Sequence, residues 1–262
     1  MFLVFNKQKI YSYIIAFAMV AILFGLTAGM NLTQDAPSVA TAAGTKELPI
    51  YCVDVKEKKL ALTMNCAWNA DDIDSILETL KKHDTKITFF MVGEWVDKYP
   101  EAVEKIAAAG QEIGNHSDAH KHVNQLNMEE NIEQIQLASD KIEKITGKAT
   151  TLYRAPYGEY NNTVVRASKT ASHYMIQWNL DTLDYKGLTG EQMWQRLENN
   201  LTSGSMILMH NGTAHTADSL EMLIHNIKEK GYEIVPVSEL IYTENYTIDA
   251  TGKQIQNTKA KE

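Results

Sequence analysis

The stretch Glu112-Ile113-Gly114-Asn115-His116-Ser117-Asp118-Ala119-His120 joins a short apolar run to two histidines that are four residues apart. The run is typical of a strand that ends in polar residues. Four residues make about one helical turn, so both imidazole rings can point at one metal ion. The alternative is two solvated histidines in a loop, because a His-x-x-x-His pair alone is a weak signal. The position of the pair directly after a strand favours the metal site.

Strand-like and helix-like runs alternate on both sides of this stretch. Strand-then-helix units imply a parallel sheet, and about 195 residues in one domain suit a barrel better than an open sheet. We therefore predict an α/β fold, a (β/α) barrel with about seven parallel strands. An open doubly wound sheet is the alternative, although no strand is followed by a glycine fingerprint for a nucleotide. The predicted strands are Leu60–Met64, Lys86–Gly93, Gln111–Asn115, Thr150–Arg154, His173–Asn179, Ser205–His210 and Tyr232–Val237.

Two of the predicted helices carry clear start signals. Asp71 is expected to cap the helix after the first strand. Asn127 and Glu130 resemble a capping box for a longer helix, which Gly147 is expected to end.

Polar, chemically useful residues follow several of the predicted strands. Because the carboxyl ends of parallel strands meet at one edge of a sheet, these residues are expected to form one site. They are Asn65, Cys66, His116, His120, Arg154, Tyr157, Asp181 and His210.

The first 30 residues have the pattern of a membrane segment. Lys7 and Lys9 precede an uncharged run whose most apolar part, Ile10 to Met30, would extend about 31 Å as a helix. We expect an uncleaved single-pass anchor with the rest of the chain outside the cytoplasm. The alternative is a cleaved signal peptide and a secreted protein, with Ala40-Thr41-Ala42 as the cleavage site. A linker over 31–48, a folded domain over 49–245 and a polar tail over 246–262 are expected to follow.

Charge and cysteine content restrict the partners. The net charge of −8 and the absence of a basic stripe argue against nucleic acid, and we expect a monomer. Two cysteines are not a disulfide framework. If 51–55 and 60–64 form a hairpin, Cys52 lies opposite Thr63 and beyond reach of Cys66, so a bridge is not favoured.

Five short motifs together resemble a known family. They are Thr63-Met64-Asn65-Cys66-Ala67-Trp68, His116-Ser117-x-x-His120, Arg154-Ala155-Pro156-Tyr157-Gly158, Asp181-x-x-Asp184-Tyr185 and Leu208-Met209-His210. Their order and spacing resemble the NodB-like polysaccharide deacetylases, carbohydrate esterase family 4, over about residues 60–240. The Cys-Ala-Trp sequence and the membrane segment resemble the subgroup found in spore-forming Gram-positive bacteria.

The resemblance implies a distorted (β/α) barrel that removes N-acetyl groups from a β-1,4-linked amino sugar polymer, such as peptidoglycan or a chitin-like glycan. It implies a divalent metal, usually zinc, held by His116 and His120. By the same match, Asp181 orients the general acid His210, Arg154 holds the base, and the Tyr157 backbone N–H meets the oxyanion. The groove would be lined by Pro156, Trp178, Tyr185 and Leu208.

Several of these residues also have simpler interpretations. Arg154 can pair with a surface carboxylate, and Asp181 and Asp184 can cap helices. His210 can be a hydrogen-bonded histidine at a strand end, and Trp68 and Trp178 can be core or groove lining.

The first motif departs from the family pattern. Two aspartates, the base and the third metal ligand, are replaced here by Asn65 and Cys66. An amide cannot accept a proton at neutral pH, and loss of a general base costs about a hundredfold to ten-thousandfold in rate. A Cys66 thiolate is a chemically sensible zinc ligand, although a free buried cysteine is the commoner fate. Asp71 or Asp72 can also serve as ligand or base, or simply begin a helix.

Three functions remain open at this point. The first is an unusual amide hydrolase, and the second is a non-catalytic descendant that binds glycan at the cell envelope. The third is a metal-binding structural protein of the spore or wall, which the groove aromatics make the least favoured.

Overall fold

The computed structural model describes residues 46–257, and its central element is β2 (Lys59–Cys66). All but the first residue of β2 are buried. β3 (Thr88–Met91) and β8 (Met206–His210) flank β2 in parallel, with Asn65 opposite both Phe90 and His210. A strand paired on both sides and covered on both faces needs apolar residues almost throughout, as the run 60–64 has.

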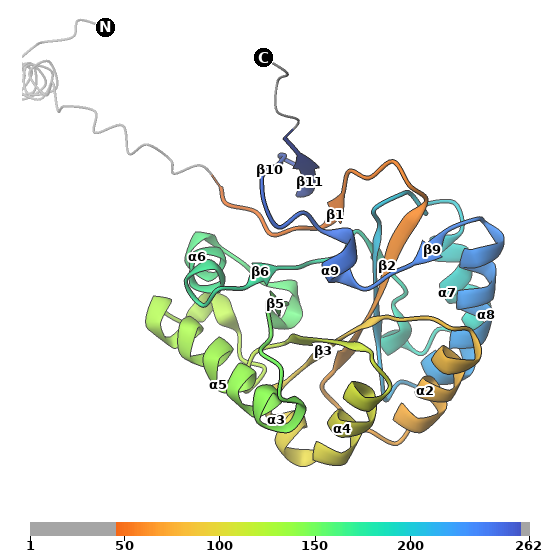
Figure 1. The fold of residues 1–262 in the computed structure, drawn as a ribbon, viewed down its shortest axis with the longest axis horizontal. Helices are drawn as coiled ribbons and strands as arrows, with labels where there is room; N and C mark the ends of the chain where they lie inside the picture. Colours follow the sequence, from red (N-terminus) through yellow and green to blue (C-terminus); the bar gives the residue numbers. More distant parts are fainter. Residues whose placement is uncertain (1–45, 258–262) are drawn as a thin grey trace, which may run out of the picture. The chain divides into compact units, whose positions relative to one another are not determined.

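Seven strands form one parallel sheet in the order β6-β5-β4-β3-β2-β8-β7, while β9 (Glu233–Ile234) pairs with the start of β2. The predicted α/β class and parallel strands are confirmed. The strands curl into a half-barrel (Figure 1). The barrel is open between its edge strands, because no pairing joins β6 to β7 within residues 46–257. The remaining strands are β4 (Glu112–Asn115), β5 (Leu152–Tyr153), β6 (Tyr174–Met175) and β7 (Leu180–Asp181).

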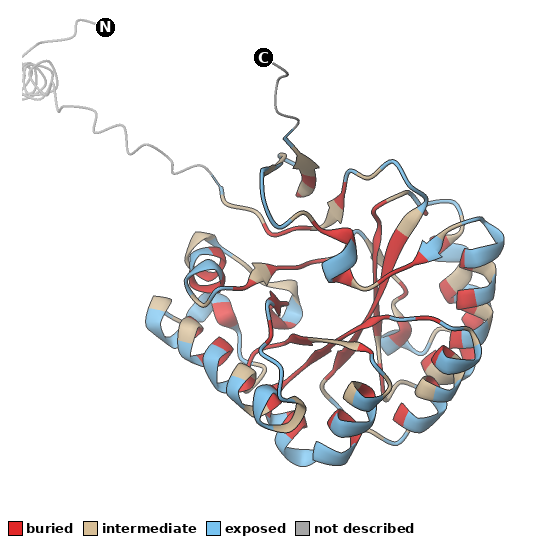
Figure 2. Cartoon of the chain, in the orientation of Figure 1, coloured by how far each residue is buried: buried red, intermediate tan, exposed pale blue. Residues whose placement is uncertain are grey.

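Amphipathic helices cover the outer face of this sheet. Figure 2 shows their buried sides turned toward the strands and their exposed sides toward solvent. The helices are α2 (Ile73–Lys82), α3 (Gly93–Lys98), α4 (Pro100–Ala108), α5 (Met128–Thr146), α6 (Asn162–Thr170), α7 (Gly190–Leu197) and α8 (Thr216–Glu229). The short helix α9 (Val237–Leu240) packs on the opposite side of the sheet, against Ala61 and Phe90.

The helix termini confirm one of the two predicted start signals. Asn127 and Glu130 form a reciprocal capping box at the start of α5, and Gly147 ends that helix in the left-handed conformation. The prediction that Asp71 caps α2 is wrong by one residue. Asp72 occupies that position, and its carboxylate accepts hydrogen bonds from Asn211 and from the Gly212 N–H instead of capping the helix.

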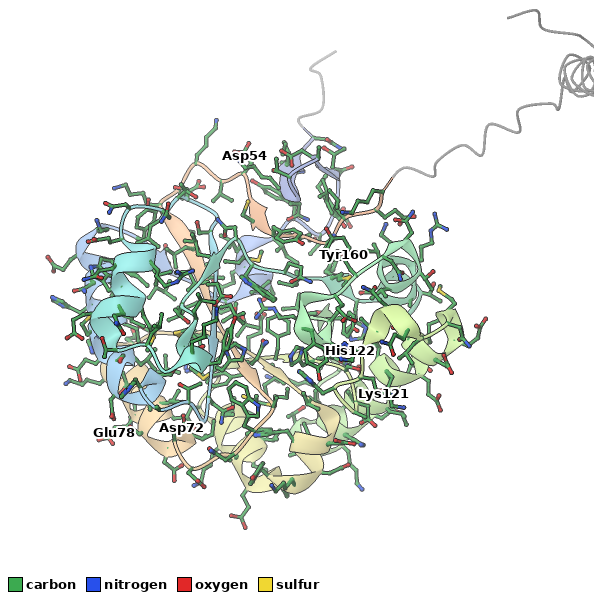
Figure 3. The ribbon with its side chains drawn as sticks, turned by 180° about the vertical axis from the view of Figure 1, so that it is seen from behind. Asp54, Asp72, Glu78, Lys121, His122 and Tyr160 are labelled. Carbon is green, nitrogen blue, oxygen red and sulfur yellow. The ribbon has the colours of Figure 1, made fainter. Side chains whose placement is uncertain are left out.

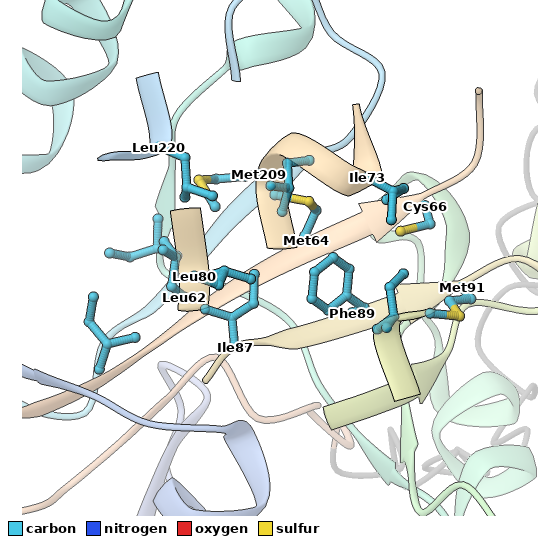
Figure 4. Close-up of a cluster of buried hydrophobic side chains, with 14 of the residues drawn as sticks. Leu62, Met64, Cys66, Ile73, Leu80, Ile87, Phe89, Met91, Met209 and Leu220 are labelled. Atoms are coloured by element: carbon cyan, nitrogen blue, oxygen red, sulfur yellow. The ribbon is translucent and has the colours of Figure 1, made fainter. Parts of the chain in front are cut away.

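Alternate residues of β2 enter different environments. Leu60, Leu62, Met64 and Cys66 pack toward the helices, among side chains such as Ile73, Phe89 and Met209 (Figure 4). Ala61 packs on the opposite side of the sheet with Phe90 and Met206. Because side chains of a strand alternate between its faces, Thr63 and Asn65 share the side of Ala61. This alternation decides which first-motif residues reach the site.

A second, three-stranded sheet differs from the expectations for both ends of the domain. β1 (Cys52–Val53) pairs in parallel with β11 (Lys253–Gln256), which pairs antiparallel with β10 (Tyr246–Ile248). The hairpin considered for 51–55 and 60–64 therefore does not form. The expected polar tail is ordered over 246–257, because Gln254 is buried and its side chain bonds the backbone of Tyr242. Both cysteines are free.

The proposed membrane anchor over 1–30 lies outside the described residues. Within 46–257, no helix combines the length and the apolar character needed to cross a bilayer.

Gly204 is the glycine whose replacement the fold should tolerate least. It adopts φ +79°, donates to the Lys59 carbonyl and accepts from the Val53 N–H. A Cβ at Gly204 would lie 1.7 Å from the Val53 carbonyl oxygen, whereas a Cβ at Gly147, with φ +68°, would meet nothing within 4 Å. We expect Gly147→Ala to cost about 1 kcal/mol, from backbone strain alone. We expect Gly204→Ala to cost roughly 3 kcal/mol or more. Urea unfolding of both variants measures the difference, and equal losses would contradict the close approach of Gly204 to Val53.

Candidate active site

A pocket of about 410 Å³ lies at the carboxyl ends of the parallel strands. A larger pocket, of about 660 Å³, is lined by residues such as Lys86 and Gln111 at the other ends of β3 and β4, and contains no histidine or cysteine. Sites on parallel sheets form at carboxyl ends, so we assign function to the smaller pocket. The predicted residues that line it are Asn65, Trp68, His116, His120, Tyr157, Trp178, Asp181, Tyr185, Leu208 and His210.

The two histidines of the opening stretch converge, but they do not lie on a helix. β4 ends at Asn115, whose side-chain oxygen accepts the Ser117 N–H at 2.8 Å and turns the chain. Ser117 and His120 then adopt positive φ angles, of 69° and 48°. The ring centroids of His116 and His120 lie 5.1 Å apart. The helical geometry assumed from the spacing is wrong, whereas the predicted convergence is confirmed.

Both imidazoles suit a metal ion in their protonation state. Burial lowers the pKa of His116 well below its ordinary value and also lowers the pKa of His120. Nδ1 of His116 lies 2.7 Å from the Arg154 carbonyl oxygen, so Nδ1–H donates there and Nε2 keeps a free lone pair. This arrangement is typical of a ligating histidine held by a backbone carbonyl.

A third protein ligand is missing from this pair. Among the described residues, no group of three His, Cys, Asp or Glu side chains could hold a metal. Cys66 points into the hydrophobic core beside Ile73 and Met91 (Figure 4), and burial raises the pKa of its thiol well above the ordinary value. Asp72 lies at the start of α2 (Figure 3), bonded to Asn211 and Gly212. The pair therefore fits a divalent cation only in part.

Arg154 lies beneath the pocket and is fully buried. Its guanidinium crosses the concave face of the sheet from the end of β5 to β2. Nη1 donates to Thr63 Oγ1 at 2.8 Å and to Asn65 Oδ1 at 3.1 Å, and Nη2 donates to the Gln177 carbonyl at 3.1 Å. The Phe90 ring lies under the guanidinium, with its centroid 4.1 Å from Cζ. All of these partners are neutral, so the alternative interpretation, in which Arg154 pairs with a surface carboxylate, is wrong.

By the family resemblance, Arg154 holds the catalytic base. In this chain the residue that it contacts at that position is Asn65. Burial lowers the pKa of the guanidinium to about 9, which leaves it charged at neutral pH. A buried cation favours an anion beside it. Here the chain supplies an amide instead.

His210 is held by Asp184, and not by Asp181 as the motif match suggests. Nδ1 of His210 lies 2.8 Å from Asp184 Oδ1, and the other carboxylate oxygen accepts the His210 N–H and the Thr216 hydroxyl. Asp184 is fully buried, whereas His210 reaches the pocket. The second aspartate of the motif lies in a turn that brings it under β8, a geometry that the motif spacing alone does not reveal.

Asp181 ends β7 and lines the pocket without contacting His210 by a hydrogen bond. Its Oδ1 accepts the N–H of Leu183 at 2.8 Å, which forms a local turn with Leu183 at φ 54°. Burial raises the pKa of Asp181 above the ordinary value for an aspartate. Its predicted role as the residue that orients His210 is wrong.

Tyr157 occupies a strained backbone conformation, with φ at 58° in the short turn Pro156–Gly158. Its ring packs 4.6 Å from His120 and stacks 4.3 Å from His122, centroid to centroid. His122 in turn pairs with Glu159 at 2.7 Å and lies near α5 in Figure 3. Sequence reasoning missed His122, although its two-residue spacing from His120 was a usable signal. The oxyanion role of the Tyr157 N–H stays a prediction.

Aromatic side chains surround the pocket mouth. Trp68, Tyr157 and Tyr185 are 49%, 58% and 47% exposed, unusually open for large apolar rings. Trp68 and Tyr185 flank His210, at centroid distances of 5.2 and 5.4 Å. Of the two interpretations offered for Trp68, groove lining is therefore confirmed and buried core is wrong. Rings open to solvent around a pocket can stack on the faces of sugars.

Comparison with known proteins agrees with this geometry. The family model Polysaccharide deacetylase matches residues 53–176. The chain is 34% identical to the uncharacterized protein YlxY of Bacillus subtilis, over 80% of this chain and 65% of that protein. It is 30% identical to a peptidoglycan-N-acetylglucosamine deacetylase of Bacillus cereus, over 71% of this chain and 69% of that protein.

Two other relatives extend the comparison. Peptidoglycan-N-acetylmuramic acid deacetylase PdaC of B. subtilis is 34% identical over 72% of this chain, which spans only 40% of its length. A crystal structure of a CE4 family pseudoenzyme from Bacillus anthracis superposes with a TM-score of 0.71 and 34% identity, covering 73% of this chain and 68% of that one. A mutant of that pseudoenzyme, described as having restored enzymatic activity, superposes equally well over 70% of its length. On the combined evidence of the family model, these relatives and the curled parallel sheet, the chain belongs to the polysaccharide deacetylase family.

Proposed function

We propose that this protein removes N-acetyl groups from an amino sugar polysaccharide, peptidoglycan or a chitin-like glycan, by hydrolysis of the amide bond. The observation that carries the proposal is the imidazole of His210, which Asp184 holds at the wall of a pocket ringed by exposed aromatic side chains. Names of relatives such as the B. cereus deacetylase support an amide substrate in a glycan.

The residues of the chain account for binding and for proton delivery. An amine leaves an amide only when its nitrogen is protonated, and a histidine paired with a buried carboxylate can deliver that proton. Asp184 fixes which nitrogen faces the pocket, because Nδ1 of His210 is committed to the carboxylate. Trp68 and Tyr185 on either side of His210 would place a sugar ring against it.

A divalent cation, zinc by the family resemblance, would bind to His116 and His120. Bound zinc supplies an electrophile and a more acidic water. Because no third protein ligand completes the set within the described residues, we expect such binding to be weak.

The proposed location is the outer face of the cell membrane. Lys7 and Lys9 before the apolar run support an anchor that leaves the domain outside, close to its polymeric substrate.

A second candidate function is glycan binding without hydrolysis. Asn65 in the position of the base, and the similarity to a CE4 family pseudoenzyme, favour it. The same pocket and aromatic rings would then bind the polysaccharide, while the reaction stops for lack of a proton acceptor.

Asn65→Asp tests the assignment of the base. A carboxylate at 65 would accept a proton and pair with the buried guanidinium of Arg154. We expect deacetylation of chitin or peptidoglycan oligomers to rise at least roughly tenfold. We expect the free energy of unfolding to rise by about 1 to 3 kcal/mol, because a buried cation gains an anionic partner. Product amine assays and urea unfolding measure the two effects.

Outcomes of that experiment separate the two functions. Turnover by the wild type and a faster variant support the deacetylase. Measurable glycan binding without turnover by either protein supports the binding function. A variant with unchanged rate and stability would contradict the placement of residue 65 beside Arg154.

His210→Ala tests the proton donor. We expect the deacetylation rate to fall about a hundredfold or more, with KM nearly unchanged, since the proton is needed only when the amide bond breaks. His225→Ala is the matched control, because His225 is exposed on α8. Equal rates for the two variants would remove His210 from the mechanism.

Zinc binding tests the incomplete ligand set. In equilibrium dialysis of the purified chain with zinc chloride, we expect about one weakly bound zinc per chain. His120→Ala should reduce the affinity at least roughly tenfold, and Cys66→Ser should leave it unchanged because the thiol faces the core. Loss of zinc from Cys66→Ser would show that the thiol turns into the site.

A further inference from the structure

The pocket contains a single carboxylate. Among its lining residues, Asp181 alone is acidic, whereas the histidines and the amide of Asn65 supply the other polar groups. Hydrolysis of an amide needs a group that takes a proton from the attacking water. Asn65 cannot do this, because a neutral amide does not accept a proton at neutral pH.

Asp181 is held on the wall of the pocket by regular structure. It ends β7 opposite Leu208, which lies two residues before His210 on β8. Its backbone carbonyl accepts the Nε–H of Arg196 from α7 at 3.0 Å. One carboxylate oxygen accepts the Leu183 N–H, and no hydrogen bond within residues 46–257 involves the other. One oxygen therefore positions the side chain while the other stays available.

The charges around Asp181 suit a proton acceptor. Its partial burial raises its pKa, as does Asp184, while His210 and Arg196 lower it. The buried guanidinium of Arg154 is also close enough to interact with it electrostatically. A carboxylate that is less solvated than an ordinary aspartate is a stronger base while it remains ionised.

We propose that Asp181 accepts the proton of the attacking water, in place of the base that Asn65 cannot supply. This inference rests on the proposed deacetylase function. The water oxygen bonds to the acetyl carbon as one water proton passes to Asp181, which gives a tetrahedral anion. The carbon–nitrogen bond then breaks as His210 protonates the nitrogen, which releases acetic acid and the free amine, and the acid loses its remaining proton to solvent as acetate. The proton on Asp181 passes to solvent, and His210 regains one.

Asp181→Asn is the decisive variant, because its side-chain oxygen can still accept the Leu183 N–H while the basicity is lost. We expect kcat to fall at least tenfold with KM changed less than twofold. Asp140→Asn is the matched control, since it removes the same charge from an exposed position on α5. Circular dichroism and urea unfolding check that the fold is retained.

A second background separates proton transfer from a structural role. In Asn65→Asp, the carboxylate at 65 takes over the proton, so adding Asp181→Asn should cost less than twofold there. A tenfold loss in the wild type and almost none in Asn65→Asp supports the proposal. Equal losses in both backgrounds, or no loss in either, overturn it while leaving the deacetylase function intact. No turnover by the wild-type chain overturns both.

Discussion

The buried guanidinium of Arg154 is the constraint on which the site depends. It reaches from the end of β5 over Phe90 of β3 to Thr63 and Asn65 of β2, and so it ties together strands that are not neighbours in the sheet. A third hydrogen bond, to the Gln177 carbonyl after β6, holds the far edge of the sheet. Burying a charge costs free energy that only its hydrogen bonds offset, so these contacts have to be made together. Together they hold the strands in place beneath the pocket.

Within residues 46–257, the Arg154 guanidinium makes no hydrogen bond to a carboxylate. Its partners are a hydroxyl, an amide, a carbonyl and two aromatic faces, that of Phe90 and that of Trp178. The position beside the guanidinium has the geometry to accept a carboxylate, but it holds the amide of Asn65. The chain is similar in sequence to a deacetylase of B. cereus and in both sequence and structure to a pseudoenzyme of B. anthracis.

Sequence patterns predicted the parallel sheet, the capping box at Asn127 and the gathering of His116, His120 and His210, because each follows from local periodicity or from the ends of strands. They did not predict which aspartate holds His210, since Asp184 reaches it only through a turn that starts at Leu183 in a left-handed conformation. The motif suggested that Cys66 lies in the site. The alternation of side chains along β2 instead points Cys66 into the hydrophobic core. The pairing of β1 with β11 joins residues about 200 positions apart, which no local pattern contains.

The same pairing of β1 with β11 sets the two ends of the folded domain next to each other (Figure 1). Neighbouring ends make a domain easy to insert into a longer polypeptide or to reconnect in a circularly permuted order, because a short linker is enough to bridge them. A domain of this design can therefore be joined to other domains. Evolution can fuse it to extra segments at either end without rearranging the sheet that carries the pocket.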